Sequence, residues 1–277
     1  ELQSAATAVG RAVSLAKLAD GRGAATVPED LTQPVDVEVD RVSFAYPGGA
    51  PVLEDLSVTL RAGTTTALVG TSGAGKSTLA ALIAGLVEPT AGNIRVGGVD
   101  TAQVSDLWTA KNVTLLTQDV HIFAGTLGDD LAMAAPGATN AELLAALAGV
   151  GLQPDSVQFA RLFPQGLDTR VGAGAGDLPP EVEQQLALAR VALAGPKVLI
   201  LDEATAEAGS DATNALEEAA ARITAGTTAL VVAHRLDQAA AADRILVMDA
   251  GRIIEDGTHA ELVAEGGRYA QLFAAWS

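Results

Sequence analysis

The sequence has no cysteine among its 277 residues, which excludes disulfide bonds and thiolate metal sites. It also has few basic residues: 17 Lys and Arg stand against 34 Asp and Glu, and the formal net charge is −17. Because nucleic-acid binding needs clustered Lys and Arg, this balance predicts no nucleic-acid partner, and solubility is the simplest reason for the acidity. No uninterrupted apolar run is long enough to cross a membrane.

The chain does not begin like a complete protein. Its first residue is Glu1 and not Met, and no basic and then apolar signal segment follows. We therefore expect a piece of something longer. With 49% apolar residues, 277 residues suffice for one sizeable α/β domain or two small ones.

Residues 70–78 carry the clearest chemical signal. They match the phosphate-loop pattern G-x-x-x-x-G-K-[ST] in full. The stretch 64–69 before them, rich in β-branched residues, predicts a buried strand, and 79–84 after them predicts a helix. A glycine-rich turn before an ordinary helix is the alternative, and the correct flanks favour the phosphate loop. The nucleotide-contacting residues would be Gly70, Thr71, Ser72, Gly73, Ala74, Gly75, Lys76, Ser77 and Thr78.

The chemistry of this loop follows from its residue types. Glycines let successive N–H groups and a helix N-terminus point at anionic oxygens. Lys76 would reach the β- and γ-phosphates, and the Ser77 hydroxyl would ligate Mg²⁺.

The remaining pattern predicts an α/β protein. Residues 2–19 have helix-forming composition and are followed by a polar linker to about 34. Strand signals between 35 and 96 predict an antiparallel patch, and residues 126–194 are mostly helical. Strands return at 198–201, 229–233 and 244–248, and their alternation with helices predicts a mainly parallel sheet.

Two carboxylates, Asp202 and Glu203, follow the apolar strand 198–201. In a parallel sheet they would emerge at the carboxyl edge, where ligands bind. Asp202 suits the Mg²⁺ shell, through a water, and Glu203 is placed to orient or deprotonate the water that attacks the γ-phosphate. An acidic pair at a strand end is often only a helix N-cap, but the complete phosphate loop favours the catalytic interpretation.

Three more polar or aromatic residues point to the same site. Gln118 follows the strand 113–117, and His234 follows 229–233. A single His at a strand end is more often structural, whereas Gln and His from neighbouring strands favour a role at the phosphates. Tyr46, one of only two tyrosines, precedes the loop and is either an adenine-stacking ring or a hairpin-edge aromatic.

Taken in order, these residues resemble the nucleotide-binding domain of an ATP-binding cassette (ABC) transporter over roughly residues 35–277. Segments 169–174 and 249–262 resemble the exporter-type branch. The resemblance implies a P-loop NTPase (RecA-like) α/β fold, with a mainly parallel sheet, an antiparallel β subdomain and an inserted α-helical subdomain. It implies ATP and Mg²⁺ as cofactors, with Tyr46 on adenine, Gln118 on Mg²⁺ and His234 on the γ-phosphate.

The resemblance also predicts the domain organisation. Residues 1–34 would be the end of a fused membrane-domain helix plus a linker, and 35–277 the nucleotide-binding domain. Its catalytic core would be 35–118 and 191–277, with a helical subdomain at 119–190. The missing membrane domain would place the chain at the cytoplasmic face of the cell membrane. Transport direction stays open, because some members of this branch import siderophores.

One motif departs from the family. Where the family has Leu-Ser-Gly-Gly-Gln at a helix N-terminus, this chain has Leu178, Pro179, Pro180, Glu181 and Val182. Proline has no N–H to donate to phosphate, and a glutamate opposes an arriving γ-phosphate. The substitution keeps a good helix start and removes the anion site.

This degenerate signature predicts an asymmetric dimer. In ABC dimers each ATP lies between one subunit's phosphate loop and the other's signature. We therefore expect an ATPase domain that powers transport as half of a heterodimeric exporter-type transporter, whose partner brings an intact signature. The alternatives are a decayed homodimer or a non-transport ABC ATPase with weak hydrolysis, for instance in DNA repair. A regulator that binds nucleotide without hydrolysis is disfavoured by the presence of Lys76 and Glu203.

Overall fold

A computed structural model of the chain describes residue 28 and residues 31–202, 210–233 and 235–276. The helix expected at 2–19, Glu203 and His234 lie outside these residues. The chain divides into two compact units, each of which is described by itself. The first comprises Glu1–Leu115, Lys197–Ile200 and Gly226–Ser277, and the second Leu116–Pro196 and Leu201–Ala225. The domain boundaries expected from the sequence stay a prediction.

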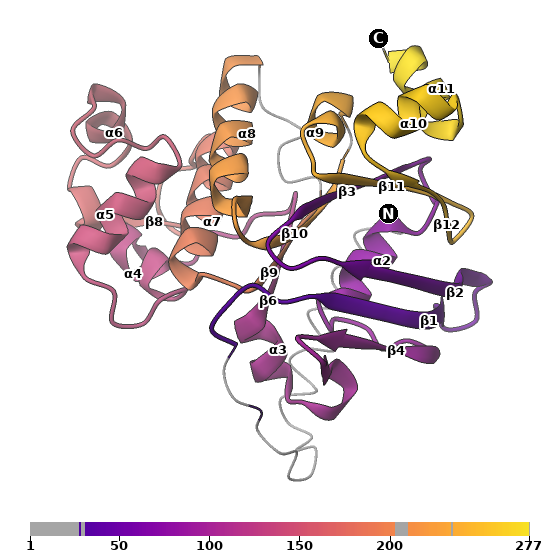
Figure 1. The fold of residues 1–277 in the computed structure, drawn as a ribbon. Coiled ribbons are helices and arrows are strands. Elements are labelled where there is room, and N and C mark those ends of the chain that lie inside the picture. Colours follow the sequence, from indigo (N-terminus) through magenta and orange to yellow (C-terminus); the bar gives the residue numbers. More distant parts are fainter. Residues whose placement is uncertain (1–27, 29–30, 203–209, 234, 277) are drawn as a thin grey trace. The chain divides into compact units, whose positions relative to one another are not determined.

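Most residues of a six-stranded sheet belong to the first unit (Figure 1), whereas the last two residues of β6 and of β9 are counted with the second. Its strand order is β12-β11-β3-β10-β9-β6, and β3 pairs in parallel with both β10 and β11, whereas β12 is antiparallel to β11. The strands are β3 Thr65–Gly70, β6 Val113–Thr117, β9 Val198–Asp202, β10 Thr228–Val232, β11 Arg244–Asp249 and β12 Arg252–Gly257. Every residue of β9 is buried, as expected for a continuous apolar strand inside such a sheet. This sheet confirms the predicted fold class.

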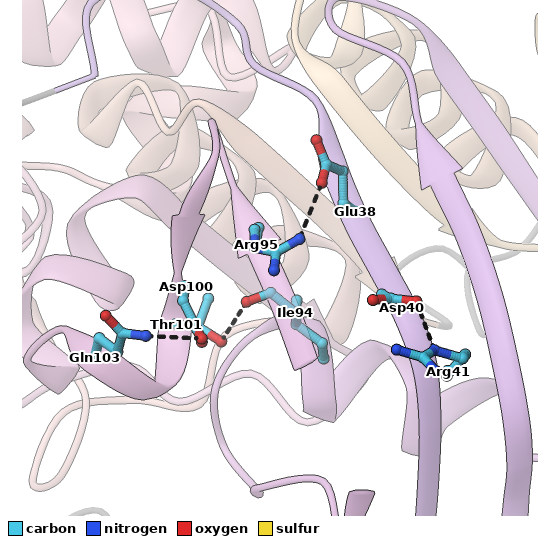
Figure 2. A network of polar contacts seen from close by, with 8 residues as sticks. All are labelled: Glu38, Asp40, Arg41, Ile94, Arg95, Asp100, Thr101 and Gln103. Atoms are coloured by element: carbon cyan, nitrogen blue, oxygen red, sulfur yellow. Dashed lines mark hydrogen bonds and ion pairs between the residues drawn. The ribbon is translucent and has the colours of Figure 1, made fainter. Parts of the chain in front are cut away.

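A second, antiparallel sheet also belongs to the first unit, in the order β2-β1-β4-β5. Its strands are β1 Val37–Ala45, β2 Pro51–Leu60, β4 Ala91–Val96 and β5 Val99–Asp100. Alternate residues of β1, such as Val37 and Val39, are buried, and the positions between them face solvent. On the solvent side Glu38 of β1 stands directly opposite Arg95 of β4, and the two form an ion pair of 3.7 Å (Figure 2).

The described residues of the first unit also form the helices α2 Lys76–Ile83, α3 Asp106–Asn112, α9 Leu236–Ala240, α10 His259–Glu265 and α11 Arg268–Trp276. Helix α2 packs on β3 and β10 and buries Leu79, Leu82 and Ile83 in the core shared with the antiparallel sheet. At the other end of the chain, Glu255 of β12 accepts the backbone N–H groups of Arg268 and Tyr269 and so caps α11.

The second unit is mostly helical, as the sequence predicts. Its helices are α4 Leu127–Ala132, α5 Asn140–Gly149, α6 Val157–Leu162, α7 Pro180–Ala194 and α8 Ser210–Thr224, and one short strand pair joins β7 Gly125–Thr126 to β8 Arg170–Val171. Helix α7 contacts α4, α5 and α8. Among the residues that the structure describes, no helix has both the length and the apolar character that a membrane crossing requires.

Candidate functional site

The phosphate loop connects the end of β3 to the start of α2, as predicted. Two of its glycines are required by the geometry. Gly70 lies so close to β11 that a Cβ added there would be 2.1 Å from the backbone oxygen of Met248. Gly75 is the N-cap of α2, with a φ of 100°, and an added Cβ would be 2.8 Å from a methyl group of Leu53. Only glycine fits at these two positions.

The loop is built for an anion. No side chain caps the start of α2, and a helix start of this kind presents backbone N–H groups to a phosphate. The Lys76 side chain folds back over the loop, where its Nζ donates hydrogen bonds to the carbonyl oxygens of Gly70 (2.8 Å) and Thr71 (3.0 Å). Lys76 is buried, so its positive charge is held within the loop, while Ser77 beside it is exposed.

Tyr46 also comes to the phosphate loop. Its hydroxyl lies 3.2 Å from Oγ1 of Thr78, in the first turn of α2, and its ring packs edge-on against Phe44. The Tyr46 side chain is 40% exposed, so part of the ring remains open to a ligand. The structure thus brings Tyr46 and the loop together, and stacking on adenine stays a prediction.

An open cleft of about 540 Å³ borders the loop at Gly73. Its other walls come from the first residues of β2 and from the turn between β11 and β12. In this turn Arg252 donates to Glu54 of β2 at 2.9 Å. The turn, β2 and the phosphate loop are therefore neighbours in the first unit.

The carboxylate and the amide that the sequence predicts as metal ligands both lie at the ends of strands, as expected. Asp202 is the last residue of β9 and is buried, at 9% exposure. Gln118 directly follows β6 and is half-buried. Both belong to the second unit, whereas Ser77 belongs to the first. Hydroxyl, amide and carboxylate oxygens are each donors that suit Mg²⁺.

The segment with the unusual signature begins α7. Pro179 is the N-cap, without a capping side chain, and Pro180 is the first helical residue. The backbone N–H groups of Val182 and Glu183 both donate to the carbonyl oxygen of Pro179, at 2.9 and 3.1 Å. Glu181 and Glu183 place two carboxylates in the first turn. The start of α7 is therefore poor in N–H donors and rich in negative charge.

Sequence reasoning missed a buried ion pair in the second unit. Arg190 of α7 donates to Asp130 of α4 at 2.7 Å, and the Asp130 side chain is fully buried. Asp130 also accepts the N–H of Phe123, and Arg190 donates to the carbonyl oxygen of His121. The pair thus fixes residues 121–123, which follow Gln118. Its only sequence signal is a single arginine in the apolar run of α7.

Comparisons with known proteins identify the family of this chain. Residues 53–206 match the family profile "ABC transporter". Two curated relatives come from Mycobacterium tuberculosis H37Rv. The mycobactin import ATP-binding/permease protein IrtA is 42% identical over 89% of this chain and 28% of its own length, and IrtB, described in the same words, is 39% identical over 86% and 40%. The chain therefore spans well under half of these relatives.

A solved structure, that of a bacterial Atm1-family ABC exporter with ATP bound, matches with a TM-score of 0.81 and 32% identity. The match covers 91% of this chain and 44% of that one. The family profile alone covers more than half of the present chain. The chain belongs to the ABC transporter family and is an ATP-binding ATPase domain of that family.

Proposed function

We propose that this ATPase domain powers transport across a membrane as one half of a heterodimeric, exporter-type ABC transporter. The observation that carries the proposal is the start of α7. There two prolines lack an N–H, the N–H groups of Val182 and Glu183 bond to the carbonyl oxygen of Pro179, and two glutamates stand in the first turn. A partner's ATP placed against this helix would find few N–H donors, and its negative phosphates would face negative carboxylates. Hydrolysis at that second site would be slow.

The other half of the catalytic machinery is intact in this chain. Lys76 and the helix start of α2 would bind the β- and γ-phosphates, and Tyr46 would stack on the base. Glu203 would orient or deprotonate the attacking water, and His234 would contact the γ-phosphate. When bound, Mg²⁺ neutralises phosphate charge, and Ser77, Gln118 and Asp202 would hold it. A partner with an intact signature would complete this site.

The relatives support a pair of unlike halves. Two differently named proteins of one organism, IrtA and IrtB, carry the same description and both resemble this chain. The description covers import, and the structural neighbour is an exporter, so we propose no transport direction and no substrate. The membrane domain to which this chain would be joined places the ATPase domain at the cytoplasmic face of the cell membrane.

The test rebuilds the signature with P179S, P180G, E181G and V182Q. Val182 is only 1% exposed, so a companion variant keeps it and carries the first three changes. Each restored donor to developing phosphate charge is worth about 2.7–4 kcal/mol by analogy with oxyanion holes. We expect ATP-dependent dimers by light scattering, trapped by adding E203Q, and faster hydrolysis without a partner.

Two controls make this test decisive. The same rebuilt chain with K76A should neither bind ATP nor dimerise. The unmodified chain should bind Mg-ATP and turn it over slowly at every protein concentration. A rebuilt chain that folds and binds ATP, yet neither dimerises nor hydrolyses it, contradicts the proposal.

A further inference from the structure

The phosphate loop is held from outside by the turn between β11 and β12. Gly251 in this turn is buried, and its N–H donates to the carbonyl oxygen of Ala74 at 3.0 Å. Ala74 directly precedes Gly75, the N-cap of α2. The turn therefore makes a direct bond to the loop, at the peptide unit just before the helix.

This bond sets the direction of one phosphate-binding donor. In a trans peptide the C=O and the N–H of the same unit point in opposite directions, and the described residues contain no cis peptide. Because the Ala74 carbonyl points at Gly251, the N–H of Gly75 points away from the turn. This N–H belongs to the N-cap of α2, where a helix start can bind an anion.

The contacts around Gly251 leave no room for a side chain. A Cβ added to Gly251 would lie 2.3 Å from the backbone oxygen of Val52, and its φ of 77° suits only glycine. On the loop side, Gly75 is enclosed by Leu53 and Met248. The loop thus contacts both β2 and the end of β11. An ion pair between Glu54 of β2 and Arg252 of β12 lies at the surface beside them.

We propose that Gly251 is a positioning residue of the ATP site, which aims the N–H of Gly75 at the bound phosphates through the Ala74 carbonyl. The inference rests on ATP binding by the phosphate loop and adds the turn between β11 and β12 to the binding machinery. It predicts that displacing the turn lowers the affinity for ATP, and that the lower folding stability of the variant does not account for the whole loss.

The test compares Gly251→Ala with a matched control, Gly98→Ala. Gly98 lies in the turn between β4 and β5, has the same φ of 77°, and an added Cβ there meets nothing within 4 Å. Both variants therefore suffer the same backbone strain, and only Gly251→Ala must shift against Val52. In the 277-residue chain we expect Gly251→Ala to raise the Kd for Mg-ATP at least tenfold by titration calorimetry, and Gly98→Ala to change it less than twofold.

Amide exchange in the unmodified chain provides a second measurement, which holds even where Gly251→Ala does not fold. Saturating Mg-ATP should slow exchange of the Gly251 N–H by a larger factor than that of the Gly97 N–H, which bonds to Asp36 in a turn away from the loop. An unchanged Kd in folded Gly251→Ala, or equal slowing at both amides, overturns the inference. If the unmodified chain itself did not bind Mg-ATP, the proposed function would be refuted and not the role of Gly251. The two failures are therefore distinguishable.

Discussion

Replacing Arg190 by Met should destabilise the second unit strongly. Arg190 and Asp130 are 16% and 0% exposed as side chains, and their nitrogen and oxygen atoms lie 2.7 Å apart. Methionine keeps most of the volume and removes the charge. The Asp130 carboxylate would then be buried with the N–H of Phe123 as its remaining hydrogen-bond donor among the described residues, and the His121 carbonyl would lose the donor that Arg190 supplies.

The expected cost is large relative to the stability of a domain. Breaking a buried ion pair by removing one partner costs about 3–5 kcal/mol, because the remaining charge is uncompensated. Domains are stable by about 5–15 kcal/mol in total. The matched control is Arg222→Met on α8, whose ion pair with Glu218 is 3.8 Å long and exposed on both sides. An exposed helix pair of this kind is worth only about 0.3–0.5 kcal/mol.

Urea unfolding at pH 7, followed by far-ultraviolet circular dichroism, measures both variants. Arg190→Met should lower the midpoint of the helical transition far more than Arg222→Met. The double variant Arg190→Met with Asp130→Asn should recover part of the loss, because it removes the stranded charge. Equal midpoints for the two single variants, or a double variant no more stable than Arg190→Met, would refute the electrostatic argument.

Three further predictions concern Glu203, the predicted catalytic base, and two surface carboxylates. Glu203→Gln should leave the Kd for Mg-ATP unchanged and lower turnover in a complex with the partner about 10²–10⁴-fold, since the amide cannot accept a proton; near-normal ATPase activity would exclude Glu203 as the base. The Arg244 guanidinium, which donates to both oxygens of Asp256, lowers the pKa of that carboxyl below its usual value. The stability that the Asp256 carboxylate contributes to the fold is therefore complete above its unfolded pKa of about 3.9 and is lost as the pH falls through the lower folded value. The difference in melting temperature between the unmodified chain and Asp256→Asn should be constant from about pH 5 to 7 and shrink below about pH 4. A difference that grows on acidification would contradict this. Glu255→Ala should cost about 0.5–2 kcal/mol in thermal unfolding because α11 loses its cap, whereas Glu265→Ala, at an exposed position, should be neutral.

The phosphate loop could be predicted in full because its signal is local. A strand, a glycine-rich turn and a helix follow one another within about twenty residues, and each needs only its own sequence pattern. The strands at β9, β10 and β11 were predictable for a similar reason, since continuous apolar runs of this length suit strands buried on both faces. Asp202 and Gln118 followed as the polar residues at strand ends.

Other parts of the site had no local signal. Gly251 stands in an ordinary glycine turn by sequence, and only the fold places its N–H on Ala74 and its Cα against Val52. Likewise, the sequence does not pair Arg190 with Asp130, because the two residues are joined only by the packing of α7 on α4. The start of α7 is intermediate: its prolines are visible in the sequence, whereas the bonds of Val182 and Glu183 to Pro179 are not.

The sequence by itself therefore determined the family, the nucleotide and the strand–loop–helix of the phosphate loop. These depend on residue types at fixed short spacings, where backbone geometry relates neighbours directly. Only the tertiary structure decided which distant residues meet, namely Gly251 with Ala74 of the loop, and Arg190 with Asp130 and His121 in the second unit. Such contacts join residues far apart in the chain, and they form because burying apolar strands and helices brings those residues within hydrogen-bond distance.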